Sequence, residues 1–144
     1  MSVVQILVVD DSLPWQRFVQ NHLDAAPELK VIDVAADGSE AVQKAKELQP
    51  HLVLMDVSLP GMNGIEATRQ IRRVSPDSKL LFVSALDDIE IIRAAFAAGG
   101  AGFVSKWDAG RELIPAIRAT LLGQRFVSSR LTGWHGSSIP ESIT

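Results

Sequence analysis

Four positions in the sequence carry residue types that can bind metal ions and phosphoryl groups. Asp10 and Asp11 are adjacent carboxylates, Asp56 is a third, Ser84 supplies a hydroxyl and Lys106 an ammonium group. If the three carboxylates meet, each close pair costs about 4 kcal/mol at an effective dielectric near 20. A divalent cation relieves that repulsion, and oxygen ligands with few charges suit Mg²⁺ beside a phosphate. The lysine adds a mobile positive charge that can neutralise an anion next to the metal.

Each of these positions directly follows a short apolar run that is typical of a buried parallel strand. Segments with apolar residues three and four positions apart, which is the spacing of an amphipathic helix, lie between the runs. The predicted strands are residues 6–9, 31–35, 52–55, 80–83 and 102–104, and the predicted helices are 15–26, 39–49, 64–74, 87–98 and 109–122. Residues that favour helix starts precede four of the helices, namely Ser12, Asn63, Asp87 and Asp108. Pro115 falls inside the last helix, so we expect that helix to kink or to begin late.

Five strand-helix units predict an α/β fold with a doubly wound five-stranded parallel sheet, (βα)5, because right-handed crossovers cover both faces with helices. The ligand site of such a sheet lies at the carboxyl ends of its strands, near the switch point in strand order. The carboxylates, the hydroxyl and the lysine should therefore converge on one edge. The alternative is that each polar residue only caps a helix, as Asp11 would. That alternative becomes weak when so many such residues share one edge.

Composition narrows the class of protein further. The chain has 144 residues, 47% of them apolar, a net charge of -3 and no cysteine, which suits one globular domain. The negative charge disfavours a broad nucleic-acid or anionic-membrane surface. No apolar run is long enough to span a bilayer, and the lack of cysteine excludes thiolate metal sites and fits a reducing compartment. We therefore predict a soluble cytoplasmic protein that binds neither nucleic acid nor membrane by itself.

These residues, in their order and spacing, resemble the receiver domains of two-component response regulators, and most of all receivers of the NarL/LuxR type. The resemblance extends to about residue 122. Its motifs are Asp10-Asp11, Asp56 within LVLMDVSLPGMNG, Ser84-Ala85 and Lys106. It implies a flavodoxin-like fold with strand order 2-1-3-4-5. It also implies a signalling protein that catalyses only its own phosphotransfer and dephosphorylation.

The resemblance divides the chain into a receiver over residues 1–128 and a flexible tail or truncated linker over residues 129–144. The segment GQRFVSSRLT looks like the one that follows the receiver in regulators with a helix-turn-helix DNA-binding domain. The residues after Ser129 are too few for such a domain, so a single-domain receiver and a receiver fragment of a transcriptional regulator both stay open. An Asp-nucleophile phosphohydrolase is disfavoured, because its second aspartate would stand where this chain has Ser12.

The resemblance implies that Asp56 accepts a phosphoryl group from a sensor histidine kinase or a phosphotransfer protein. Mg²⁺ would be bound by Asp11, Asp56 and the Ser58 carbonyl, and by Asp10 through water. A carboxylate can attack an activated phosphoryl group when a metal and a lysine stabilise the equatorial charge, so the site needs little other machinery. Lys106 would pair with one phosphoryl oxygen.

The resemblance also implies a switch that reports the phosphoryl group. Ser84 would donate its hydroxyl to a phosphoryl oxygen, and Phe103 takes the family's aromatic switch position. We expect Ser84 to move toward the phosphoryl group and Phe103 to turn from an outward to an inward rotamer. The readout would lie on the face made by helix 87–98, strand 102–104 and helix 109–122. A phosphorylation-dependent homodimer or partner contact is expected there.

Overall fold

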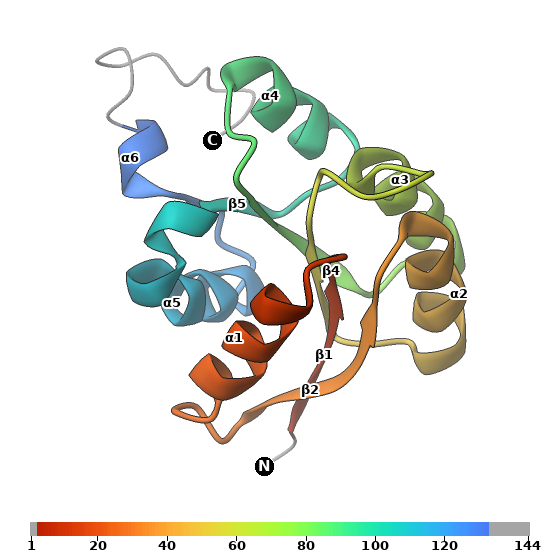
Figure 1. Ribbon diagram of the computed structural model, residues 1–144, viewed down its shortest axis with the longest axis horizontal. Coiled ribbons are helices and arrows are strands. Elements are labelled where there is room, and N and C mark those ends of the chain that lie inside the picture. The colour runs from red at the N-terminus through yellow and green to blue at the C-terminus, as the bar shows by residue number, and fades with distance from the viewer. Residues whose placement is uncertain (1–2, 133–144) are drawn as a thin grey trace.

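The computed structural model describes residues 3–132, which form one parallel sheet with helices on both faces (Figure 1). Its elements are β1 Val4–Val9, α1 Leu13–Leu23, β2 Leu29–Ala35, α2 Gly38–Leu48, β3 Leu52–Met55, α3 Gly64–Val74, β4 Lys79–Ser84, α4 Ile89–Ala97, β5 Gly102–Ser105, the 3₁₀ turn η1 Lys106–Asp108, α5 Ala109–Leu121, β6 Phe126–Val127 and α6 Ser129–Thr132. The sheet order is β2-β1-β3-β4-β5-β6. The predicted order of the first five strands is confirmed. The prediction of five strands is corrected to six, because the short β6 pairs with the outer edge of β5.

The two faces of the sheet carry two separate apolar cores, because side chains alternate along each strand. In β1, Ile6 and Val8 pack with α1 and α5, whereas Leu7 and Val9 pack with α2, α3 and α4. Both faces of the central strands are therefore buried, which explains their nearly continuous apolar sequences. None of the helices within residues 3–132 has the length and apolar character needed to cross a membrane.

Side-chain caps fix the starts of most helices. Ser12 and Asn63 accept hydrogen bonds from the backbone three residues ahead, as predicted for α1 and α3. The prediction that Asp87 starts the fourth helix is wrong by one residue, because Asp88 accepts the bond from the Ile91 N–H and α4 begins after it. Asp108 precedes α5 as predicted, but its carboxylate makes no capping bond and is bound by arginines instead.

Pro115 lies inside α5 without delaying the start of that helix. The helix begins at Ala109 and continues to Leu121, so the expectation of a late start is wrong. Pro115 itself is exposed, whereas its neighbours Leu113 and Ala116 are buried against the sheet. Packing of the buried stripe thus holds the helix together across the missing backbone hydrogen bond.

The chain after α5 folds back onto the sheet where a flexible tail was predicted to begin (Figure 1). The prediction is wrong for residues 129–132, which form α6, because Leu131 is buried in the same apolar core as Phe103 and packs with Val127. The rest of the predicted tail, residues 133–144, lies outside the residues that the structure describes.

Candidate functional site

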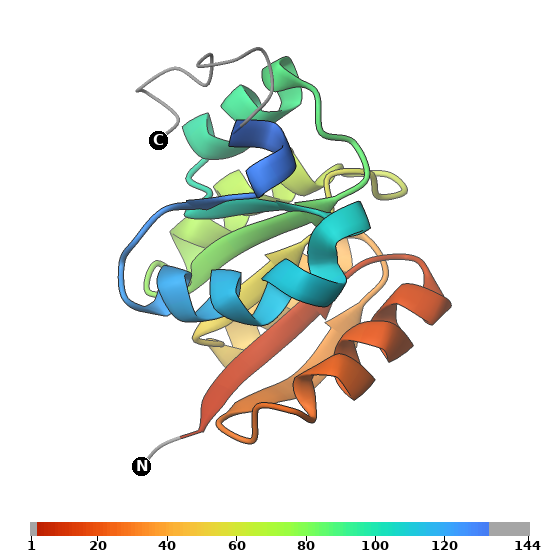
Figure 2. The same ribbon diagram turned by 90° about the vertical axis from the view of Figure 1, so that its left-hand side faces the viewer.

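The loops that follow β1, β3, β4 and β5 come together at the carboxyl edge of the sheet, on the right-hand side of Figure 2. β1 and β3 are neighbours although β2 separates them in sequence, so the strand order changes direction there. Asp10 and Asp11 follow β1 and Asp56 follows β3. One carboxylate oxygen from each of these residues lies within 4.8 Å of the others. The predicted convergence of the three carboxylates is therefore found at the switch point.

Lys106 joins two of the carboxylates from the end of β5. Its Nζ lies 2.6 Å from Asp10 Oδ2 and 3.3 Å from Asp56 Oδ2. The same ammonium group stands over the ring of Trp15, 4.8 Å from the ring centroid. Three contacts therefore hold one lysine at the centre of the site, and its single positive charge offsets only part of the negative charge around it.

Asp10 is buried and held at both ends. Its Oδ1 accepts a hydrogen bond from the Ser12 N–H at 2.8 Å, and the Gln16 amide donates to its backbone oxygen at 2.7 Å. Burial raises the pKa of the Asp10 carboxyl above its usual value, against the lowering by Lys106 and by the Ser12 N–H. The charged form of Asp10 is thus costly to keep in this position, and an added cation would favour it.

The Asp56 backbone is fixed by its neighbours on both sides. Its N–H donates to the Val9 oxygen at 3.1 Å, and the Ser58 N–H reaches Asp56 Oδ1 at 3.4 Å. Gly64 begins α3 so close to Asp56 that a β-carbon at Gly64 would overlap the Asp56 carbonyl oxygen. Sequence reasoning did not identify Gly64 as a positioning residue, although it directly follows the cap residue Asn63. The exposed Ser58 lies beside the cluster, and a ligand role for its carbonyl stays a prediction.

The two predicted switch residues lie deeper in the sheet. Ser84 is buried, and its Oγ accepts a hydrogen bond from the Leu86 N–H at 3.1 Å. Phe103 is fully buried and stacks on Phe82 with the ring centroids 6.1 Å apart. The expected outward rotamer of Phe103 is therefore not the one found. The ring lies inward with no phosphoryl group present, because β6 and α6 extend the core on that side.

The donor set fits a hard divalent cation. Within residues 3–132, Asp10, Asp11 and Asp56 form the one group of carboxylates and histidines close enough to share an ion. All three ligands are oxygens and Asp11 is exposed, so water can complete the coordination. The geometry thus combines a cation site, a lysine and a buried carboxylate at one strand end. That combination suits the binding of a charged phosphoryl group.

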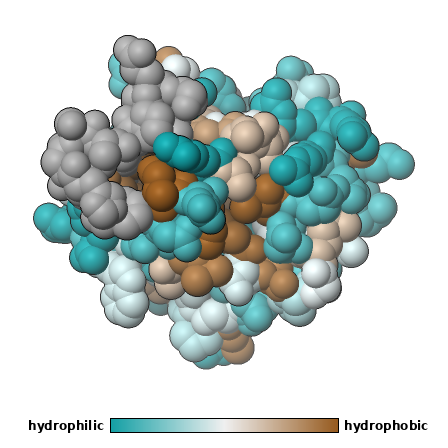
Figure 3. All heavy atoms as spheres, turned by 90° about the horizontal axis from the view of Figure 1, so that it is seen from above, coloured by the Kyte–Doolittle hydropathy of each residue, from teal (hydrophilic) through white to brown (hydrophobic). Residues whose placement is uncertain are grey.

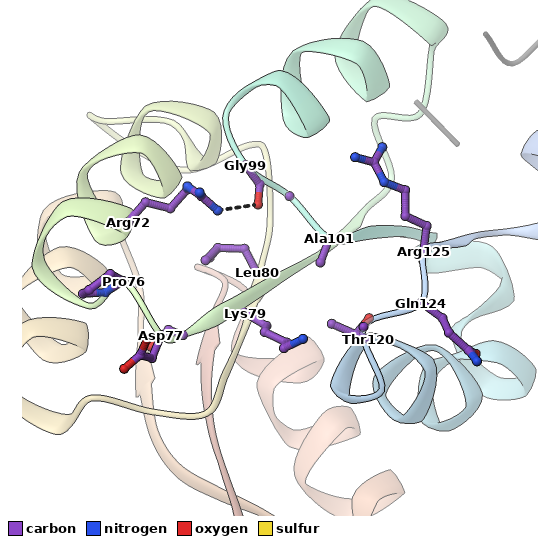
Figure 4. A pocket seen from close by; sticks show the side chains of 13 residues that line it. Arg72, Pro76, Asp77, Lys79, Leu80, Gly99, Ala101, Thr120, Gln124 and Arg125 are labelled. Carbon is purple, nitrogen blue, oxygen red and sulfur yellow. Dashed lines mark hydrogen bonds between the residues drawn. The ribbon is translucent and has the colours of Figure 1, made fainter. Parts of the chain in front are cut away.

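A hollow of about 430 Å³ at the opposite end of the sheet is separate from this cluster (Figure 4). Arg72, Lys79 and Arg125 line it, and Arg72 donates to the Gly99 oxygen at 3.3 Å. The carboxyl ends of α3, α4 and α5 adjoin this hollow, so their partial negative charges account for the basic side chains. Its chemistry is that of helix ends and not of a phosphoryl site.

Known proteins share this sequence and fold. The model of the response regulator receiver domain matches residues 6–118. Response regulator UvrY of Escherichia coli K12 is 33% identical over 127 residues, which are 88% of this chain and 58% of UvrY. Transcriptional regulatory protein LiaR of Bacillus subtilis is 34% identical over 131 residues, 91% of this chain and 62% of LiaR. A crystal structure of a LuxR-family two-component response regulator from Aurantimonas sp. SI85-9A1 has a TM-score of 0.86 at 34% identity and covers 91% of this chain and 94% of that one. The chain thus spans less than two thirds of the length of either curated relative.

Proposed function

The chain belongs to the response regulator receiver domains, and from that premise we propose that Asp56 accepts a phosphoryl group from a phosphohistidine. The observation that carries the proposal is the position of Lys106, whose Nζ contacts both Asp10 and Asp56 beside a third carboxylate. In the transfer, a bond forms between an Asp56 carboxylate oxygen and phosphorus as the nitrogen-phosphorus bond of the donor breaks. The product is an acyl phosphate on Asp56.

Each remaining residue of the site has a role in that transfer. Lys106 neutralises a phosphoryl oxygen, and the Ser84 hydroxyl donates to another after leaving the Leu86 N–H. Asp11, Asp56 and the Ser58 carbonyl would hold Mg²⁺, with Asp10 acting through water. When bound, the ion offsets the charge of the carboxylates and of the transferring group.

The donor would be a sensor histidine kinase or a phosphotransfer protein, and apolar residues around the site support a protein partner. Leu13 after β1 is 53% exposed, Leu86 after β4 is 45% exposed and Trp107 after β5 is 73% exposed. Large apolar side chains that surround a polar centre are typical of a protein docking surface. A cytoplasmic location and the homodimer stay predictions.

The alternative is that the chain is the receiver part of a DNA-binding transcriptional regulator. The chain spans only 62% of Transcriptional regulatory protein LiaR, which favours that reading. The reading frame beyond codon 144 decides between the two. The phosphoryl acceptor on Asp56 is common to both.

The test is phosphorylation of the full chain by acetyl phosphate or a phosphohistidine donor with Mg²⁺. We expect one acid-stable, base-labile phosphoryl group in the wild type and none in Asp56→Asn, as measured by intact-protein mass. Asp77→Asn is the matched control, because Asp77 is an exposed carboxylate at the opposite end of the sheet. Modification that persists in Asp56→Asn would contradict the site assignment.

A further inference from the structure

Residues 124–132, which we call the C-terminal strap, run along the outer edge of β5 and end in α6, near α4 and α5 (Figure 1). The Ser128 N–H donates to the Phe103 oxygen at 3.0 Å, and the Ser105 N–H donates to Ser128 Oγ at 2.8 Å. Ser128 is fully buried. The strap is thus hydrogen-bonded to both ends of a three-residue stretch of β5.

Charged groups at the start of α5 hold the other half of the strap. The Arg130 guanidinium contacts Asp108 at two points, with Nε 2.7 Å from Oδ2 and Nη2 3.3 Å from Oδ1. Glu112 Oε2 accepts from the Ser129 N–H at 3.2 Å and from the Ser129 hydroxyl at 2.7 Å. Asp108 is buried, so its two-point contact with an arginine is partly removed from water.

Apolar contacts join the strap to α4. Leu131 is buried in the core that also contains Ile92 and Phe103. The Arg125 guanidinium stands over the Phe96 ring, 4.7 Å from its centroid. Figure 3 looks onto this edge of the molecule and shows apolar residues gathered between hydrophilic margins. The face on which sequence reasoning placed the readout is therefore already covered by the chain's own strap.

One short segment connects the strap to the carboxylate cluster. Phe103, Ser105 and Asp108 contact the strap, whereas Lys106, which stands among them, contacts Asp10 and Asp56. A shift of the lysine toward a phosphoryl oxygen must therefore move residues that also bind the strap. This is a continuous physical connection between two sites.

We propose that the α4–β5–α5 face is a docking surface for an extended peptide, that the C-terminal strap is its occupant, and that its docking is coupled to the phosphoryl group on Asp56. The inference rests on the proposed function. Ser84 leaves space beside β4 when it moves toward the phosphoryl group, which favours the inward Phe103. The docked strap closes the core over the same ring, so docking and phosphorylation favour each other. A partner that adds a strand to β5 must first displace the strap.

The test compares two arginines that contact the same carboxylate, in the full chain. Arg130→Ala removes the strap's arginine, and Arg111→Ala removes an arginine of α5 whose Nη2 lies 3.0 Å from Asp108 Oδ1. In the wild type we expect beryllofluoride with Mg²⁺ to increase amide-exchange protection over residues 126–131. Arg130→Ala should lower that protection and weaken beryllofluoride binding about five-fold or more, because coupling is reciprocal. Arg111→Ala should change neither.

Ser128→Ala is a second variant, since it removes the acceptor of the Ser105 N–H, and we expect the same two effects. Loss of protection in the strap with unchanged beryllofluoride affinity would overturn the coupling. Strap amides that exchange freely in the wild type would overturn the docking. A wild type that binds no beryllofluoride overturns the proposed phosphoryl acceptor and the coupling with it, whereas the docking is judged separately from exchange without beryllofluoride.

Discussion

At the scale of single residues, the negative charge of the site is unevenly offset. Lys106 contacts Asp10 and Asp56, whereas Asp11 is exposed and has no ion pair within residues 3–132. Asp11 also does not cap α1, because Ser12 accepts the capping bond from Trp15. Its carboxylate therefore contributes repulsion to the metal-free protein and attraction only when a cation is bound.

Asp11→Asn should accordingly stabilise the metal-free protein and weaken Mg²⁺ binding. The gain in free energy of unfolding should be about 1 kcal/mol or less, because water screens an exposed charge. Thermal unfolding without Mg²⁺ measures the first effect, and the rise in melting temperature with Mg²⁺ concentration measures the second. A loss of stability in the metal-free variant would instead identify Asp11 as a structural residue.

The sequence predicted the residues of this site better than their conformations. Three aspartates and a lysine each follow an apolar run, and parallel strands with right-handed crossovers leave their carboxyl ends on one edge. The roles of Gly64 and Gln16 were missed, because each depends on a contact with the backbone of a residue in the site. The inward Phe103 was missed because the core around it is completed by residues more than twenty positions later in the chain.

At the scale of elements, strands and helices with a strong local pattern formed as predicted, and elements made by distant contacts did not. Residues 52–55 and 64–74 have the predicted bounds, since their burial is written into their own sequence. β6 has only two residues and takes its strand conformation from pairing with β5. The start of α4 was misplaced because Asp87 and Asp88 are equally good caps until their backbone is known.

Pro115→Ala should stabilise the protein, because it restores a backbone donor inside a helix that is already continuous. We expect a gain of about 1 to 3 kcal/mol in free energy of unfolding, reduced by the greater freedom of alanine in the unfolded chain. Denaturant unfolding measures it. Gly110→Ala is a matched change in the same helix, where a β-carbon meets no atom within 4 Å, and should gain no more than about 1 kcal/mol. Equal effects of the two variants would mean that Pro115 carries no special cost.

At the scale of the whole molecule, the strap connects the end of α5 to the edge of β5, so the last described residues complete the core begun by the first strand. Its ion pair depends on pH. The hydrogen bond from Arg130 is the main reason that the pKa of the Asp108 carboxyl lies below its usual value of 3.8. A lowered folded-state pKa means that the stabilisation is complete above that usual value and is lost as the pH falls through the folded-state value.

The strap's contribution to stability should therefore be constant at neutral and mildly acidic pH and disappear in acid. We expect wild type to melt above Arg130→Ala from pH 7 down to the usual aspartate pKa, and the two curves to converge below it. Thermal unfolding across that pH range measures the difference. A difference that persists when Asp108 is fully protonated would show that packing of the Arg130 stem, and not the ion pair, holds the strap.

The pairing of β6 with β5 also bears on how the protein behaves at high concentration. A parallel sheet exposes unpaired backbone N–H and C=O groups at each outer strand, and such edges pair readily with other chains. β2, at one edge, carries Lys30 and Asp33 and meets β1 with a register shift, features that discourage such pairing. β5 has the apolar sequence GFVS and would have no such protection without β6. The strap therefore shields the molecule from aggregation, and any partner that releases it must cover the same edge.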